Sequence, residues 1–316
     1  MKEIIPPVKK ELLLAELTKE RFIRTTNYGS NEIFVVTNND APNTLKEIGR
    51  LREVSFRAAG GGTGLDCDLD NFDTDKICYK QLIVWNPEDK EIVGGYRFML
   101  IRDAEKDKNG IPKLSTSHYF KFSEKFIKNY APYTIELGRS FVQPLYQPSS
   151  GNRKGLFSLD NLWDGLGAIH IDNPEMKYFF GKMTMYKNFN REARDMILYF
   201  LDLYFPDKEK LAIPIHPLSF ETDISAFKSQ LKIGMAYKEA HAILNQSVRK
   251  LGENIPPLFN SYMNISPSMK TFGTADNHDF GGVEETGILV TIADIYPSKK
   301  ERHVSSYQKK ITKHQR

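Results

Sequence analysis

The sequence predicts one α+β domain, a mixed sheet flanked by helices with an elaborated C-terminal end. The first reason is size: 316 residues with 40% hydrophobic and 12% aromatic content can bury a substantial core. No Pro/Gly/Ser-rich linker divides the chain. The second is element order: after a first helix come a strand, a helix, a three-strand meander, a helix, a strand and a helix. We therefore expect one domain over residues 1–298, elaborated from about residue 206.

The first elements are predicted from periodicity and turn residues. A helix should run from about Val8 to Arg21, after two prolines and with leucines spaced along one face. The β-branched segment Asn31–Thr37 should be a strand. Thr44 and Glu47 form a capping-box pattern, which predicts a helix from there to the glycines at residue 60.

The later elements follow from the same signals. Gln81–Trp85 and Glu91–Leu100 are joined by a five-residue turn and should form a hairpin. The remaining predictions are a helix from about Asp160, a strand over 178–186, helices over 191–205, 236–250 and 257–264, and a last strand over 287–296.

The segment Ile135–Val142 is the most informative one, because it places charged residues inside an apolar strand. Charged side chains are rarely buried unless they are paired or used, so Glu136 and Arg139 indicate a site. Side chains three apart point to opposite faces of a regular strand, but a bulge at Gly138 would turn both toward one cleft.

Composition limits the function classes. The N-terminus does not resemble a secretory signal and no later run is long enough to span a bilayer, so a cytoplasmic protein is expected. Cys67 and Cys78 indicate neither a disulfide framework nor a zinc site. No nucleic-acid-binding motif occurs. The basic residues of 299–316 predict a flexible tail that is either simply solvated or attracted to an acidic protein or an anionic membrane.

Four polar groups recur in a recognisable order along the chain. They are Arg52 with Phe56, Asp70 with Asp73, Arg97 in a Gly-Tyr-Arg-Phe segment, and Glu136 with Arg139. This order resembles the acyl-homoserine-lactone synthases and the related N-acyltransferases of ornithine- and glycine-lipid synthesis, which belong to the GNAT superfamily. Gly94-Gly95-Tyr96-Arg97, Glu136–Ser140 and the Leu162-Trp163-x-Gly165-Leu166 helix look closest to the lipid-forming, hemolysin-like branch. The likeness covers roughly residues 45 to 190.

The resemblance implies a fold and a reaction. The fold would be a three-layer GNAT-like one with a mainly antiparallel sheet. The enzyme would move a 3-hydroxy fatty acyl group from acyl carrier protein to the amine of glycine or ornithine. No bound cofactor or metal is implied, because the phosphopantetheine thioester of the carrier is the donor.

The same resemblance gives the polar residues roles that suit their chemistry. Glu136 would remove the amine proton, directly or through water. Asp70 and Asp73 would bind the acceptor ammonium or share the proton relay, and Arg97 or Arg139 would hold its carboxylate. Backbone N–H groups beside the bulge would bind the oxyanion. The catalytic set is thus Glu136, Arg139, Asp70 and Asp73, and the substrate-binding set is Arg52, Phe56, Arg97, Gly138 and Ser140.

The donor prediction rests on the segment after the site strand. A glycine-rich turn that binds the pyrophosphate of coenzyme A is replaced by Gln143–Pro148, which favours a carrier protein. Arg153 and Lys154, with lysines at 121, 125 and 128, would dock that acidic partner.

Other interpretations stay open at this stage. Each polar residue alone could be structural, since Asp70 and Asp73 could cap a loop and Arg52 could be their ion-pair partner. The chain could be a signalling-type N-acyl amino acid or lactone synthase, or a non-catalytic membrane-associated protein. Glycine is preferred to ornithine because no further acid pair is available for a second ammonium.

Overall fold

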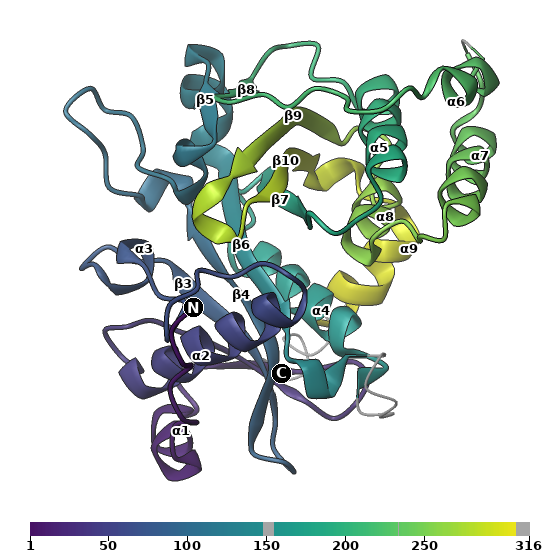
Figure 1. The fold of residues 1–316 in the computed structure, drawn as a ribbon. Coiled ribbons are helices and arrows are strands. Elements are labelled where there is room, and N and C mark those ends of the chain that lie inside the picture. Colours follow the sequence, from purple (N-terminus) through teal and green to yellow (C-terminus); the bar gives the residue numbers. More distant parts are fainter. Residues whose placement is uncertain (148–154, 233, 308–316) are drawn as a thin grey trace.

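The computed structural model describes residues 1–147, 155–232 and 234–307. Its centre is an eight-stranded sheet in the order β1-β2-β3-β4-β6-β7-β10-β9 (Figure 1). The bounds in that order are Phe22–Thr25, Glu32–Val36, Lys80–Asn86, Glu91–Leu100, Thr134–Val142, Tyr178–Met185, Val283–Thr291 and Lys270–Asn277. Within the described residues, β6 and β7 form the only parallel pair. The mixed, mainly antiparallel sheet is therefore confirmed.

Helices cover both faces of this sheet, as the alternation of side chains along β3 shows. Ile83 and Trp85 pack with α2 (Pro42–Ala58), whereas Leu82 and Val84 pack with α4 (Ser158–Asp172). Helix α5 (Arg191–Tyr204) lies on the α4 side. The other helices are α1 (Lys10–Glu16), α3 (Asn71–Thr74), α6 (Ser225–Gln230), α7 (Tyr237–Lys250), α8 (Pro257–Met263) and α9 (Pro297–Lys300). The three-layer arrangement is confirmed.

The central strands β6 and β7 part soon after they meet. Their pairing is confined to Thr134–Glu136 opposite Tyr178–Phe180, although both strands continue for several residues. Past Glu136 a cleft opens between them. A second, two-stranded sheet of β5 (Phe120–Phe122) and β8 (Ala212–Pro214) lies beside β9 (Figure 1).

Several local predictions were wrong. Helix α2 begins at Pro42 with no side-chain cap, so Thr44 and Glu47 are not a capping box. They lie inside the helix, where Thr44 bonds Glu16 and Glu47 bonds Arg50. Strands β1 and β9 were missed, and β10 spans Val283–Thr291 instead of 287–296.

The bulge in β6 lies one residue later than predicted. Gly138 pairs regularly with Arg97, whereas Arg139 and Ser140 together oppose Tyr96 on β4 (register Arg97↔Gly138, then Gly95↔Phe141). Arg139 takes the left-handed conformation that the bulge requires, with φ of 52°. The extra residue that redirects the strand is thus Arg139.

The C-terminal segment differs from the predicted flexible tail as far as residue 307. A π-helical turn over Glu301–Ser305, which directly follows α9, packs against α4, where the His303 ring bonds Asp164 at 2.9 Å. His303 is buried, and its backbone carbonyl lies where a Cβ on Gly167 of α4 would be. Among the described residues no helix is long and apolar enough to cross a membrane.

Candidate active site

A buried cluster of two arginines and one carboxylate connects α2, α3 and β4. Asp73 is fully buried, and its Oδ2 accepts hydrogen bonds from Arg52 at 3.1 Å and Arg97 at 2.9 Å. Gln81 donates to Asp73 Oδ1 at 2.9 Å. Burial alone would raise the pKa of Asp73, but Arg52 and Arg97 outweigh it and hold that pKa well below its usual range. Asp73 is therefore a buried anion between two cations.

Asp70 completes this cluster on the solvent side. Its Oδ1 accepts a hydrogen bond from Arg97 at 2.7 Å, while its backbone N–H donates to Asp73. Burial would lower the pKa of Arg97, but Asp73 and Asp70 raise it above its ordinary value. Arg52 and Asp73 were predicted to meet substrate, but neither lines any of the cavities described below. Asp73 instead holds Arg97 in place, and Arg52 bonds Asp73. Arg97 and Asp70 reach the cavity described below.

Glu136 lies behind the cavity wall and not in the cleft. Its side chain is fully buried and accepts hydrogen bonds from the Tyr79 hydroxyl, the Ser115 hydroxyl at 3.2 Å and the Thr116 backbone N–H at 3.1 Å. It does not contact Arg139, whose Nε lies 3.1 Å from Asp68 and whose guanidinium lies over the Phe280 ring at 4.2 Å. The prediction that Glu136 and Arg139 face one cleft was wrong, because Ser115 stands between Glu136 and the cavity.

A polar cavity of about 310 Å³ lies where these groups meet. Its charged lining consists of three cations, Arg97, Arg139 and Lys182, and one acid within the described chain, Asp70. Ser115, Gly138 and His118 also contribute to it. A small zwitterion matches such a lining, since a carboxylate needs cations and an ammonium needs an acid. We refer to this space as the acceptor cavity.

A narrower space lies between the parting strands β6 and β7. This space, of about 90 Å³, is lined by Leu137, Gly138, Arg139 and Ser140 of the bulge region and by Gly181 and Lys182 of β7. We call it the donor cleft, and both it and the acceptor cavity are named after the roles proposed for them below. Phe56 lines it too and packs edge-on against Phe280, with ring centroids 5.0 Å apart. Gly138, Arg139 and Lys182 line both this cleft and the acceptor cavity. The two spaces therefore meet at these three residues.

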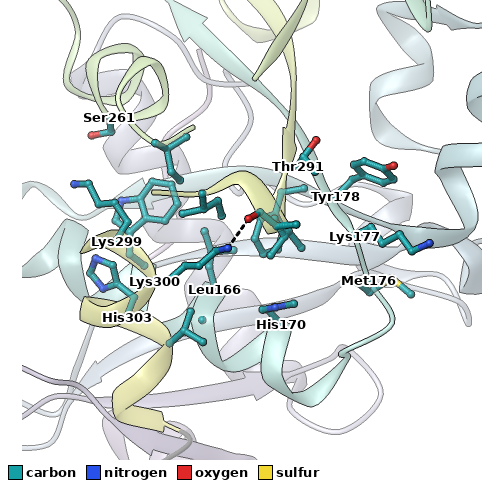
Figure 2. Close-up of a pocket in the computed structure, with 18 of the residues that line it drawn as sticks. Leu166, His170, Met176, Lys177, Tyr178, Ser261, Thr291, Lys299, Lys300 and His303 are labelled. Atoms are coloured by element: carbon teal, nitrogen blue, oxygen red, sulfur yellow. Dashed lines mark hydrogen bonds between the residues drawn. The ribbon is translucent and has the colours of Figure 1, made fainter. Parts of the chain in front are cut away.

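A larger space, of about 590 Å³, continues from the donor cleft along α4. We call it the tail chamber, after the alkyl chain proposed below to occupy it. Leu159, Trp163 and Leu166 of α4 line both spaces. Figure 2 shows Leu166 and His170 on one side of this tail chamber, Thr291 and Tyr178 on another, and Lys299, Lys300 and His303 of the C-terminal segment on a third. Residues predicted to belong to the flexible basic tail thus supply one wall of a mainly apolar chamber.

Sequence reasoning missed the buried pair Lys182 and Glu285. Lys182 of β7 donates to Glu285 of β10 at 2.5 Å and lies over the Tyr119 ring at 4.6 Å. Burial lowers the pKa of Lys182, which Glu285 opposes. The available signal was the one that identified Glu136: a charge inside the apolar run Phe179–Met183. Tyr79 and Ser115 gave no comparable signal.

The predicted docking residues are only partly placed. Arg153 and Lys154 lie outside the described residues. Lys125 pairs with Glu209 at 2.6 Å and Lys128 with Glu124 at 2.9 Å, both on the exposed surface. Within the described chain no group of three or more His, Cys, Asp or Glu side chains has the arrangement of a metal site.

Comparison with known proteins places this site in a family. Residues 51–154 match the acetyltransferase (GNAT) domain. The glycine N(alpha)-acyltransferase of Phocaeicola vulgatus is 55% identical over 98% of this chain and 94% of its own length. The protein of the same name from Bacteroides thetaiotaomicron is 55% identical over 97% of this chain and 91% of its own.

One similar solved structure is that of FeeM, an N-acyl amino acid synthase from uncultured soil microbes. The match has a TM-score of 0.39 and 9% sequence identity, and it covers 88% of this chain and 97% of FeeM. The two curated relatives confirm the enzyme prediction over the non-catalytic alternative. Because the identity to them extends over nearly the whole chain, the protein belongs to their family within the GNAT acyltransferases and transfers an acyl group to the amine of an amino acid.

Proposed function

We propose that the protein transfers a long 3-hydroxy fatty acyl group from the phosphopantetheine thioester of acyl carrier protein to the α-amine of glycine. The observation that carries this proposal is the series of three spaces that meet in order: acceptor cavity, donor cleft and tail chamber. They match the three parts of the reaction complex, which are a small zwitterion, a thioester and an alkyl chain.

The acceptor cavity supports glycine. Asp70 is the one acid among the described lining residues, so once it binds the α-ammonium the cavity offers no second acid for the side-chain ammonium of ornithine. Asp70 is placed to bind the α-ammonium, and Arg97 and Arg139 the carboxylate. The names of the two curated relatives point to the same acceptor.

Glu136 is our general base, acting through Ser115. The Ser115 hydroxyl lines the acceptor cavity and donates to Glu136 at 3.2 Å. As the amine loses a proton to the Ser115 oxygen, the Ser115 proton passes to Glu136. In this proposal the Ser115 hydroxyl takes the place of the direct or water-mediated contact expected from the sequence.

The segment after β6 supports a carrier-protein donor. Pro144–Tyr146 forms a 3₁₀ turn in which the Tyr146 hydroxyl bonds Asp89, so the turn is not a glycine-rich phosphate loop. Docking of the acidic carrier by Arg153 and Lys154 belongs to this proposal, as does a cytoplasmic location with peripheral contact between the basic C-terminal residues and an anionic membrane. The 3-hydroxyl group follows from the resemblance of the motif set to the lipid-forming branch.

The test combines the purified protein with 3-hydroxyacyl carrier protein or the matching coenzyme A thioester, and with glycine or ornithine. Mass spectrometry of the products should detect N-acylglycine, formed faster from the carrier-protein donor. Acylornithine, or a lactone, as the main product would contradict the acceptor assignment. Equal use of the coenzyme A thioester would contradict the donor assignment.

The tail chamber predicts a steep dependence on acyl chain length. Burying one methylene is worth about 0.8 kcal/mol, so kcat/KM should rise about fourfold per methylene until the chamber is full. Ser261 of α8 lines the chamber, and Ser261→Phe should shift the optimum to shorter chains. The control is Ser298→Phe, at an exposed position of α9 that does not line the chamber. An unchanged optimum in Ser261→Phe would place the chain elsewhere.

A further inference from the structure

The place where the amide bond forms is narrowly defined by the cavities. If the amine lies in the acceptor cavity and the thioester in the donor cleft, the two react where these spaces meet. Gly138, Arg139 and Lys182 are the residues that line both. Gly138 has no side chain, and a Cβ built there would meet no atom closer than 3.7 Å, so the reacting groups have room beside it.

Of the two cations at this junction, Lys182 has the more available charge. The Arg139 guanidinium lies against the Phe280 ring and close to Asp68. The Lys182 ammonium has three N–H donors, of which Glu285 takes one at 2.5 Å. Its side chain is only 12% exposed, lies over the Tyr119 ring and lines both spaces, so its charge is weakly screened by solvent.

Glu285, which also lines the donor cleft, fixes the position of Lys182. The Glu285 carboxylate also accepts hydrogen bonds from the Thr184 hydroxyl at 2.8 Å and the Asn277 amide at 3.1 Å. These donors come from β7 and β9 on either side of β10 and immobilise the carboxylate. The ammonium is therefore preorganised, which is the condition under which a charge contributes most to a transition state.

We propose that Lys182 is a catalytic residue that stabilises the oxyanion of the tetrahedral intermediate, an assignment that rests on the proposed N-acyl transfer. The amine nitrogen attacks the thioester carbon, a C–N bond forms, and the carbonyl π electrons move to the oxygen, where Lys182 donates to the negative charge. A proton leaves the nitrogen toward Ser115 and Glu136. Collapse reforms the C=O bond and breaks the C–S bond, and the departing thiolate takes up a proton.

The first test is Lys182→Met, compared with the wild-type enzyme at saturating donor. Loss of one oxyanion donor should lower kcat about 10²–10³-fold while the KM for glycine is unchanged. Lys182→Arg keeps the charge and should recover part of the rate. Lys187→Met is the matched control, because Lys187 is exposed just beyond the end of β7 and lines none of the three spaces.

Lys182→Met leaves Glu285 buried without its cation, which destabilises the fold. A second variant therefore separates a loss of catalysis from a loss of folding. The double variant Lys182→Met with Glu285→Gln removes both charges, and its kcat should be as low as that of the single variant. A higher KM for glycine with kcat retained would make Lys182 a carboxylate anchor and overturn the proposal. So would wild-type kcat in the folded double variant.

Hydroxylamine as acceptor separates this inference from the proposed function. If wild-type protein acylates hydroxylamine but not glycine, the acceptor assignment fails, and Lys182→Met should still lose its rate with hydroxylamine. A second outcome is that the wild-type protein acylates glycine and Lys182→Met keeps the wild-type kcat with both glycine and hydroxylamine. The proposed function would then stand, and the role of Lys182 would be wrong.

Discussion

Glu136→Gln should lower kcat by about 10²–10⁴-fold, the usual contribution of a general base. Glutamine has the same size and can still accept hydrogen bonds at its carbonyl oxygen, but it cannot take up the proton that leaves the amine. The loss should appear in kcat at saturating glycine. In the pH dependence of kcat/KM, the limb that reports the base should disappear.

Two further variants make this result specific. Glu47→Gln changes another buried carboxylate, one that bonds Arg50 on α2 and lines none of the three spaces, and it should leave kcat unchanged. Ser115→Ala should reduce kcat less than Glu136→Gln, because a water molecule can occupy the place of the hydroxyl. Full activity in folded Glu136→Gln would rule out Glu136 as the base.

Asp73→Asn should destabilise the protein by about 3–5 kcal/mol, because it leaves buried guanidinium charge without its anion. Arg52 is fully buried and pairs only with Asp73 in the described structure, whereas Arg97 keeps Asp70. Urea unfolding measures the change. The control is Asp75→Asn, at an exposed position directly after α3, for which we expect a change within about 0.5 kcal/mol.

The same variant makes a prediction about pH. The pKa of Asp73 is lower in the folded than in the unfolded protein, so its contribution is complete above the unfolded value of about 4. It is lost progressively as the pH falls below that value toward the depressed folded pKa. The difference in unfolding free energy between wild type and Asp73→Asn should therefore shrink on acidification. A difference that stays constant down to about pH 2 would contradict the ion-pair assignment.

The strands that define the fold were predictable because their residues repeat an apolar pattern. The hairpin of β3 and β4 and the strand with Glu136 are examples. Strand β9 was missed because its sequence, Lys-Thr-Phe-Gly-Thr-Ala-Asp-Asn, is polar, and β1 because it is only four residues long. Tertiary pairing makes both of them strands, and local sequence does not encode that pairing.

For the site, the residues that belong to it could be predicted from the sequence more reliably than the contacts between them. A charge in an apolar strand marks Glu136, and the same rule applied to β7 would have marked Lys182. No local pattern predicts that Glu136 bonds Tyr79 and Ser115 instead of Arg139, because Tyr79 and Ser115 come from other segments of the chain. Likewise the bulge at Arg139 depends on the register with β4, which only the assembled sheet fixes.

The attachment of the C-terminal segment to α4 has a consequence for the order in which the enzyme is completed during synthesis. Asp164 of α4 binds Asn27 at 2.8 Å and His303 at 2.9 Å, so distant parts of the chain meet on one carboxylate. The residues that line the acceptor cavity lie within 70–182 and are translated long before residues 291–304, which wall the tail chamber. A nascent chain thus holds every residue that lines its acceptor cavity early, yet it has no closed chamber for the alkyl chain until α9 and residues 301–305 leave the ribosome.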